Sequence, residues 1–233
     1  MIRVSDVSKS YIDGDVEVKA LRGVTMQIDR GEFVSIAGPS GSGKTTLLNL
    51  IGCIDDLDAG EIFIEDVPIS TLDKKALTEL RRARIGFIFQ TFNLIPVLSA
   101  YENVSLALSL LSLPKVEVRD RTMALLREVG LEGMEHRRPS KLSGGQQQRV
   151  AIARALVKEP IIVLADEPTA NLDSETGESV LRLMKNINER HGTTFVFSTH
   201  DPMVMEFAGR LCRLHDGLLE REERRPATAG SVS

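Results

Sequence analysis

The sequence contains few cysteines, no tryptophan and no long apolar run. Its two cysteines, Cys53 and Cys212, lie far apart and lack the spacing of a metal site, so we expect two reduced, buried thiols. The longest apolar stretch, Ile161–Ala165, is far shorter than the roughly 18 residues that a membrane-spanning helix needs. Residues 1–6 also lack the apolar core of a signal peptide. The sequence therefore predicts a cytoplasmic protein that acts at a membrane only through a partner.

A basic excess is also missing, since the formal net charge is -4. Proteins whose main partner is nucleic acid usually carry a clear excess of lysine and arginine, so we expect no nucleic-acid partner. What the sequence does have is 233 residues, 42% of them hydrophobic, which is enough for one large α/β domain with a sizeable core.

Short apolar strands alternate with helical patterns along most of the chain. The predicted strands span residues 2–7, 24–28, 32–37, 61–64, 85–89, 161–165 and 194–198, with a β pair around Gly217, and the predicted helices begin at Lys44 or span 73–84, 144–157 and 174–190. This alternation predicts a mostly parallel sheet covered on both faces. Leucines at helical spacing in residues 99–131 indicate a helical insert, and residues 220–233 read as a frayed, solvated tail.

A glycine-rich segment follows the strand at 32–37 and fits the phosphate-binding pattern G-x-x-x-x-G-K-[ST] at every fixed position. Glycines let successive backbone N–H groups point at phosphate oxygens, and the positive end of the following helix adds to the same site. We expect Lys44 to reach the β- and γ-phosphates and Thr45 to bind Mg²⁺. The nucleotide-binding residues predicted here are Gly38, Pro39, Ser40, Gly41, Ser42, Gly43, Lys44, Thr45 and Thr46.

Two carboxylates, Asp166 and Glu167, end the apolar strand at 161–165. Asp166 is expected to orient the Mg²⁺ shell, and Glu167 to polarise an attacking water. Glu rather than Gln or Asn at position 167 favours a competent hydrolase over an inactive nucleotide-binding protein.

The segment Leu142-Ser-Gly-Gly-Gln146 could by itself be a capping device for a helix. Because it lies between the phosphate loop and the acidic strand, in that order, it resembles the signature sequence of the ABC ATPase family. The resemblance covers nearly the whole chain. Gln90 matches the family's Q-loop glutamine and His200 its switch histidine, while Tyr11, expected in a loop, resembles the aromatic residue that stacks on adenine.

The resemblance implies a P-loop NTPase core with an N-terminal antiparallel β subdomain and an inserted α-helical subdomain. It places one ABC ATPase domain at residues 1–225, the helical subdomain at about 91–158 and a flexible tail at 226–233. It further implies ATP and Mg²⁺ as cofactors and a head-to-tail dimer of two such subunits, most simply a homodimer. The dimer follows from the family likeness more than from local chemistry.

In that dimer, residues from the signature segment would meet the γ-phosphate bound to the other subunit; they are Ser143, Gly144, Gly145 and Gln146. Glu167 would then be the catalytic base, His200 would contact the γ-phosphate, and Gln90 would sense Mg²⁺ or water. Asp173 would link the two sites. The implied metal ligands are Thr45, Gln90 and Asp166.

The family likeness also implies an integral-membrane permease as partner and a place on the cytoplasmic face of the membrane. Phe92, Leu94 and Ile95 could line a groove for that partner or could pack the helical insert itself. The motifs most resemble the lipoprotein-releasing and macrolide-exporting branch. A cell-division ABC ATPase of the same broad lineage and a soluble ABC scaffold of iron–sulfur assembly remain as alternatives. Co-purification of an integral membrane protein would favour transport over the scaffold.

Overall fold

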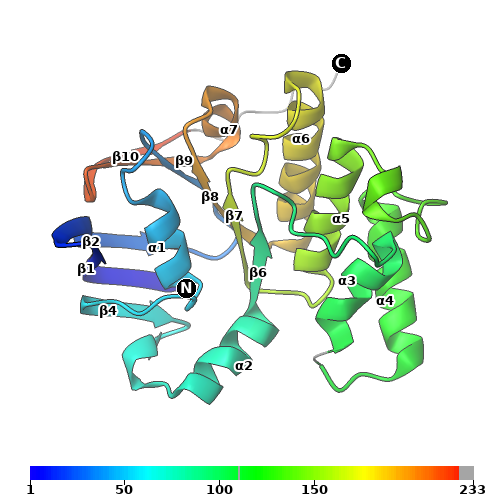
Figure 1. Ribbon diagram of the computed structural model, residues 1–233, viewed down its shortest axis with the longest axis horizontal. Helices are drawn as coiled ribbons and strands as arrows, with labels where there is room; N and C mark the ends of the chain where they lie inside the picture. The colour runs from blue at the N-terminus through cyan, green and yellow to red at the C-terminus, as the bar shows by residue number, and fades with distance from the viewer. Residues whose placement is uncertain (110, 226–233) are drawn as a thin grey trace.

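The computed structural model describes residues 1–109 and 111–225, so the tail predicted at 226–233 lies outside the described residues. The described part of the chain contains two sheets, of which the larger runs through the centre of the molecule and the smaller lies at one side, with helices packed on and between them (Figure 1). Among the helices of the described residues, none is long and apolar enough to cross a bilayer.

The larger sheet has six strands in the order β10-β9-β3-β8-β7-β6. Its members are β3 (Phe33–Ala37), β6 (Ile85–Ile88), β7 (Ile162–Asp166), β8 (Thr194–Thr199), β9 (Arg210–His215) and β10 (Leu218–Arg224). Only the β9–β10 pair is antiparallel within the described sheet, which confirms the predicted mostly parallel sheet.

Strand β10 corrects the expectation that the chain frays from residue 220 onward. Gly217, at a φ of 77°, turns the chain back, and Glu222 then lies opposite Cys212 of β9. The buried guanidinium of Arg210 donates from Nη2 to Glu222 at 2.6 Å. A buried cation needs a paired carboxylate, and this pairing across the two strands explains why a charged segment is ordered.

The smaller sheet is antiparallel, in the order β2-β1-β4-β5, with β1 (Ile2–Asp13), β2 (Val16–Ile28), β4 (Ala59–Ile64) and β5 (Val67–Pro68). The sequence predicts only the buried parts of β1 and β2. Their outer halves form an exposed hairpin, in which Tyr11 lies opposite Val18. The hairpin signals, which the prediction missed, are the turn at Asp13-Gly14 and the alternation of Val16 and Val18 with charged residues. Tyr11 lies in a strand rather than in a loop.

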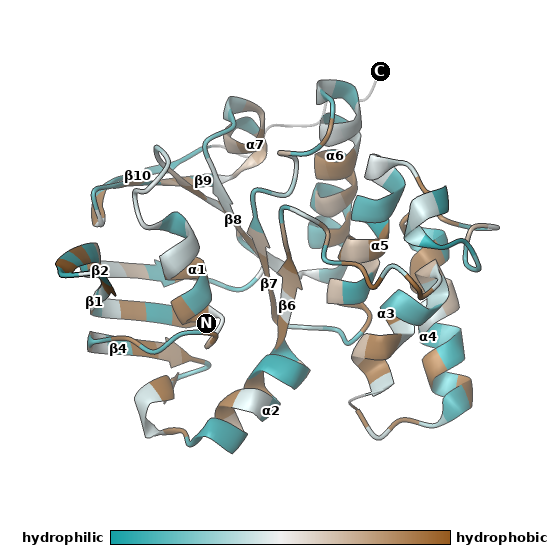
Figure 2. Cartoon of the chain, viewed as in Figure 1, coloured by the Kyte–Doolittle hydropathy of each residue, from teal (hydrophilic) through white to brown (hydrophobic). Residues whose placement is uncertain are grey.

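Two hydrophobic cores lie on opposite faces of the larger sheet. Side chains alternate between them along the buried strands, as Leu164 and Val196 face one core while Val163 and Phe197 face the other. Helix α1 (Lys44–Ile51) fills the first core between the two sheets, and α5 (Gly144–Leu156) and α6 (Ser174–His191) cover the second. Figure 2 shows the resulting apolar strands at the centre of the molecule.

The predicted helical insert consists of α3 (Ala100–Ser109) and α4 (Lys115–Glu128), which pack against α5 at one side of the molecule (Figure 1). Val104 and Leu108 of α3 and Leu126 of α4 are buried in this contact. The remaining helices are α2 (Lys74–Arg84), α7 (Pro202–Phe207) and the 3-10 turns Ile69–Thr71 and Pro139–Lys141.

The two cysteines are buried and free in the described structure, as expected. Burial raises the pKa of the Cys53 thiol to about 11 and that of the Cys212 thiol to about 12. Both are therefore inert thiols that act as small apolar side chains.

Candidate active site

The predicted chemistry gathers at the carboxyl edge of the six-stranded sheet. Strand β3 leads into the phosphate loop, β7 ends at Asp166, and β8 leads to His200. These three strands are adjacent and parallel, so their carboxyl ends lie at the same edge.

The N-terminus of α1 is open toward this edge. Gly43 is the N-cap residue, at a φ of 100°, and no side chain of the described residues caps the helix there. A Cβ on Gly43 would lie 2.3 Å from the carbonyl oxygen of Ala20, so only glycine fits. The first N–H groups of α1 are thus available to an external acceptor.

Lys44 and Ser42 make the same end ready for an anion. The buried Nζ of Lys44 donates to the carbonyl oxygens of Gly38 at 2.9 Å and Pro39 at 2.8 Å. Within the described residues, the buried Ser42 Oγ finds no hydrogen-bond partner. An ammonium that meets only carbonyls, an orphaned hydroxyl and an open helix end fit a phosphate group.

Thr45 and Asp166 lie together, as their predicted metal-binding role requires. Thr45 Oγ1 donates to Asp166 Oδ1 at 3.1 Å, and Ser198 Oγ also donates to Asp166. Thr45 and Asp166 also line a cavity of about 180 Å³. A hydroxyl and a carboxylate at this distance are oxygen donors of the kind that Mg²⁺ takes beside nucleotide phosphates, so the residues present fit that ion.

Glu167 is held in place by the segment after β8. Its backbone has a φ of 46°, in the left-handed region, and its N–H donates to the carbonyl oxygen of Ser198 at 3.0 Å. Nδ1 of His200 lies 2.7 Å from Glu167 Oε1, and Thr199 Oγ1 donates to Oε2 at 3.3 Å. A non-glycine residue in this conformation stores strain of about 1–3 kcal/mol, which such sites use to aim a side chain.

The signature segment lies apart from this group, at the N-terminus of α5. Ser143 Oγ accepts from the N–H of Gln146 at 3.3 Å, and Gln146 Oε1 accepts from the N–H of Ser143 at 3.0 Å, which is a complete capping box. Gly145 packs so closely on α6 that a Cβ would lie 2.4 Å from Thr176 Cγ2. The capping interpretation of this segment is therefore correct, and any nucleotide contact would be added to it.

Three other predicted residues have partners of their own. The exposed Gln90 lies in the turn after β6, where its carbonyl oxygen accepts from Asn171 Nδ2 at 2.8 Å. Tyr11 donates from its hydroxyl to Asp55 Oδ2 at 2.6 Å, and burial followed by this hydrogen bond raises the tyrosine pKa. Asp173 caps α6 by accepting from the N–H of Thr176 at 2.9 Å, which lowers its pKa.

The apolar residues after Gln90 are expected either to pack the helical insert or to line a groove for a partner, and the structure contains both kinds. Leu94 packs against the core of the helical insert, whereas Ile95 is 37% exposed and Val97 is 70% exposed. The segment thus supplies both an anchor to the insert and an apolar surface.

Two residues that hold this site together escape sequence reasoning. Gln148, buried in α5, donates from Nε2 to the carbonyl oxygen of Pro168 at 2.6 Å, just after Glu167. Arg154, also in α5, donates from Nη2 to the carbonyl oxygen of Phe92 at 2.7 Å and from Nη1 to that of Asn93. The only sequence signal for these two residues is that each is polar at a position where the helical period predicts a buried side chain.

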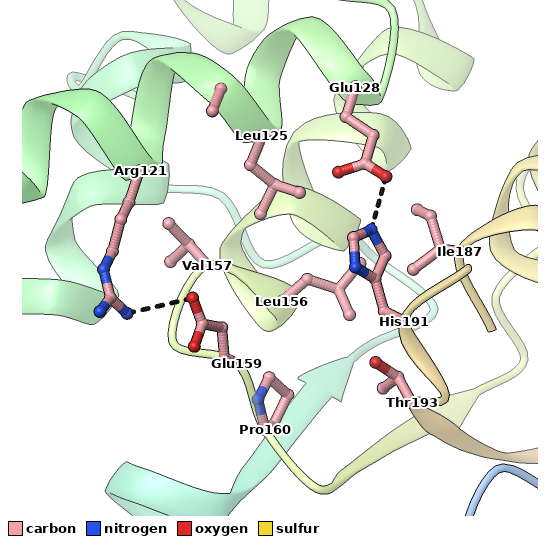
Figure 3. Close-up of a pocket in the computed structure, with 11 residues that line it drawn as sticks. Arg121, Leu125, Glu128, Leu156, Val157, Glu159, Pro160, Ile187, His191 and Thr193 are labelled. Atoms are coloured by element: carbon pink, nitrogen blue, oxygen red, sulfur yellow. Dashed lines mark hydrogen bonds and ion pairs between the residues drawn. The ribbon is translucent and has the colours of Figure 1, made fainter. Parts of the chain in front are cut away.

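A larger cavity, of about 440 Å³, lies elsewhere, between α4 and the ends of α5 and α6 (Figure 3). Its charged rim is paired: Arg121 lies 3.3 Å from Glu159, and His191 lies 2.7 Å from Glu128. These pairs join the helical insert to the rest of the chain across the cavity. Size alone therefore does not mark the candidate active site.

Comparison with known proteins agrees with this arrangement. A family model described as ABC transporter matches residues 21–170. An uncharacterized ABC transporter ATP-binding protein of Methanocaldococcus jannaschii, MJ0796, is 49% identical over 228 residues, which cover 96% of this chain and 97% of that protein. The macrolide export ATP-binding/permease protein MacB of Syntrophobacter fumaroxidans is 45% identical over 224 residues, which cover 95% of this chain but 31% of that protein.

Solved structures lead to the same family. A dimeric structure of MJ0796, described as a bacterial ABC transporter cassette, matches with a TM-score of 0.89 at 48% identity, covering 97% of this chain and all of that one. A second dimeric structure of that cassette, in a post-hydrolysis state bound to ADP and Pi, matches with a TM-score of 0.88 over the same shares. The chain belongs to the ABC transporter family of ATP-binding proteins.

Proposed function

We propose that this chain binds ATP with Mg²⁺, hydrolyses it inside a head-to-tail dimer of two such subunits, and thereby drives a membrane permease. The observation that carries the proposal is the open end of α1, where Lys44 meets only carbonyls, beside the Thr45–Asp166 pair. The dimeric cassettes of the M. jannaschii relative, one of them bound to ADP and Pi, support it.

The phosphate groups of ATP take the place of the loop carbonyls as partners of the Lys44 ammonium. Lys44 then neutralises charge on the β- and γ-phosphates, while the open N–H groups of α1 bind their oxygens. The ring of Tyr11 stacks on the adenine. Thr46, the next residue of α1, completes the loop side of the site.

Thr45, Asp166 and Gln90 would hold Mg²⁺. When bound, the ion neutralises charge that develops on the phosphate oxygens. Asp166 keeps its orientation through the hydroxyls of Thr45 and Ser198. Gln90 approaches from the turn that Asn171 and Arg154 hold in place.

Glu167 polarises the attacking water and accepts its proton as the water oxygen bonds to the γ-phosphorus and the bond to the β-phosphate oxygen breaks, leaving ADP. In the chain alone, His200 donates to the Glu167 carboxylate at 2.7 Å. The exposed His200 side chain is free to turn to the γ-phosphate, which releases one carboxylate oxygen for the water.

The signature segment completes the site of the other subunit. Ser143 accepts one hydrogen bond in the capping box, so its O–H proton stays available to a phosphate oxygen. Gly144 and Gly145 offer backbone N–H groups at the same helix end, with Gln146 beside them. Asp173, at the nearby start of α6, would link the two sites across the dimer.

The transport part of the proposal follows the macrolide-exporting relatives, whose name joins an ATP-binding part to a permease. We infer a permease of the lipoprotein-releasing or macrolide-exporting type as partner, and a place for this chain on the cytoplasmic face of the membrane. The domain division proposed for this role keeps the helical subdomain at about 91–158 within a domain of residues 1–225.

Glu167→Gln tests the catalytic half. We expect ATP hydrolysis to fall by roughly 10²–10⁴-fold, and ATP to trap a dimer that is visible by light scattering. The control is Glu167→Gln combined with Lys44→Ala, which should stay monomeric with ATP. Turnover at the wild-type rate would show that Glu167 is not the catalytic base.

Purification in detergent from native membranes tests the transport half. We expect an integral membrane protein to be retained with the chain. A soluble complex that contains none would support the scaffold alternative instead.

A further inference from the structure

Beside Tyr11 lies a cluster of charged side chains that the proposed mechanism does not use. It consists of Lys9, in β1, and of Asp55 and Asp58, in the turn between α1 and β4. We call these three residues the Tyr11 clamp. Their contacts fix the ring of Tyr11 relative to α1, the helix whose N-terminus carries the phosphate site.

The hydroxyl of Tyr11 is anchored on the carboxylate of Asp55. The O–H donates to Asp55 Oδ2 at 2.6 Å, and the backbone N–H of Asp56 donates to the other oxygen, Oδ1, at 2.8 Å. Burial by itself would raise the pKa of Asp55, but the hydrogen bonds from Tyr11 and Asp56 outweigh it and lower that pKa. Asp55 is therefore an ionised acceptor, and hydrogen bonds to ionised groups are the strong kind.

Lys9 holds Asp55 and the ring together. Its Nζ lies 3.4 Å from Asp55 Oδ1 and 3.3 Å from Asp58 Oδ1, and it donates to the carbonyl oxygen of Asp56 at 2.6 Å. The same ammonium lies over the ring of Tyr11, 5.3 Å from its centroid, where a cation is attracted to the ring face. Tyr11 remains 39% exposed, so the opposite face of its ring is left for a base.

The turn that carries the clamp is fixed to α1. The N–H of Ile54 donates to the carbonyl oxygen of Asn49, in α1, at 2.8 Å, so Asp55 follows the helix without a free linker. On the other side, the N–H of Ser10 in β1 donates to Asp58 Oδ2 at 2.6 Å. One helix therefore carries the phosphate site at its N-terminus and, just beyond its C-terminus, the acceptor for the residue that meets the base.

We propose that Asp55 is a positioning residue for nucleotide binding, which together with Lys9 holds the ring of Tyr11 in the orientation in which adenine stacks on it. The inference rests on the proposed function and specifies how the base side of that site is prepared. A ring whose hydroxyl is free turns about its side-chain bonds, and immobilising such a side chain on binding costs affinity. A ring that is already held avoids this cost.

Paired titrations with ADP and inorganic pyrophosphate, each with Mg²⁺, test the proposal, because the two probes differ only by the adenosine. Calorimetry measures both affinities. We expect Asp55→Ala to weaken ADP binding by roughly two- to tenfold, the cost of ordering one side chain, and not to weaken pyrophosphate binding. Removal of a negative charge by itself strengthens the binding of both anions, so a loss confined to ADP reports the lost positioning.

Three further variants serve as controls. Asp56→Ala makes the same change of charge one residue away, on an exposed side chain, and should bind ADP like the wild type. Asp55→Asn keeps an oxygen that accepts from the Tyr11 hydroxyl, so it should lose less affinity than Asp55→Ala. Tyr11→Phe keeps the ring without the donor, so it should weaken ADP binding, and adding Asp55→Ala to it should cause no further loss. Thermal unfolding of each variant checks its folding.

Two results would overturn the inference while leaving the proposed function intact. One is that Asp55→Ala binds ADP as tightly as Asp56→Ala does, and the other is that Asp55→Ala loses equal affinity for ADP and for pyrophosphate.

Tyr11→Ala separates these results from a failure of the stacking itself. We expect it to weaken ADP binding by roughly fivefold or more, as for the loss of other aromatic platforms under a base. If Tyr11→Ala binds ADP like the wild type, the proposed role of Tyr11 fails, and the inference fails with it.

Discussion

Two helix N-termini in this chain, those of α1 and α5, have glycine at the N-cap or in the first turn but differ in how their backbone N–H groups are bound. The α1 end takes no side-chain cap from the described residues and lies beside the buried ammonium of Lys44. The α5 end is closed by the reciprocal bonds of Ser143 and Gln146. The first is prepared for an anion, whereas the second is stable without one.

This difference suits the α1 end to nucleotide binding and the α5 end to the contact between subunits in the proposed dimer. A helix end that lacks its own cap can gain its missing hydrogen bonds from a ligand, so the proposed function assigns nucleotide affinity to the α1 end. The capped end still offers the Ser143 O–H and the N–H groups of Gly144 and Gly145. In the proposed dimer it would meet the nucleotide of the other subunit without an ordering step.

The largest expected effect is at the α1 end. Lys44→Ala removes the ammonium that meets the phosphates, and we expect ATP affinity to fall by roughly a hundredfold or more, because hydrogen bonds to charged groups contribute about 1.5–3 kcal/mol each. Titration with a fluorescent ATP analogue measures this. Lys19→Ala, on the exposed hairpin, is the control, and equal affinities of the two variants would contradict the comparison.

A middle-sized effect is expected at the packing of α5 on α6. Gly145→Ala places a Cβ against Thr176 Cγ2, and we expect a loss of about 1–3 kcal/mol in the free energy of unfolding. Thr176→Ser removes that methyl group and keeps the hydroxyl that bonds to Asp173, so the double variant should recover most of the loss. Chemical denaturation of the wild type, Gly145→Ala and the double variant measures the free energy of unfolding of each. If the double variant is no more stable than Gly145→Ala, the contact with Thr176 Cγ2 is not the cause of the loss.

The smallest effect on stability is expected at Ser143, where two substitutions separate its roles. Ser143→Ala removes the cap and should cost about 0.5–2 kcal/mol of stability, whereas Ser143→Gly should cost only a few tenths. If the hydroxyl also contacts the nucleotide of the other subunit, both variants lose ATPase activity to a similar degree. If activity instead follows stability, the hydroxyl acts only as a cap.

The sequence predicts most of the core of the fold for a physical reason. Strands such as β7 and β8 are buried on both faces, so their apolar runs are continuous, and α6 has one apolar face and a capping aspartate, Asp173. The outer half of the β1–β2 hairpin is stabilised by backbone pairing with little burial. Its strand signal is short, an Asp13-Gly14 turn with Val16 and Val18 alternating with charged residues, and without it Tyr11 is misplaced in a loop.

For the candidate site, the motif residues are predictable but their supports are not. A phosphate loop and an acidic strand end are local patterns, so Lys44 and Asp166 can be placed from the sequence. Contacts between distant segments, such as that of Arg154 with Phe92 or of Gln148 with Pro168, depend on how α5 packs. The cavity beside β6 is of this second kind, since its lining comes from β6 with the turn after it, from α3 and from the end of α5.

The bonds of Lys44 to the carbonyls of Gly38 and Pro39 have a consequence for kinetics. The loop itself supplies two acceptors that hold the Lys44 ammonium, so we expect a phosphate to exchange with them and not to have to fold the loop. We expect ATP association to be limited by encounter, and differences in affinity among variants of this loop to lie in the dissociation rate. The lifetime of the bound nucleotide then sets how long a subunit can wait for its partner.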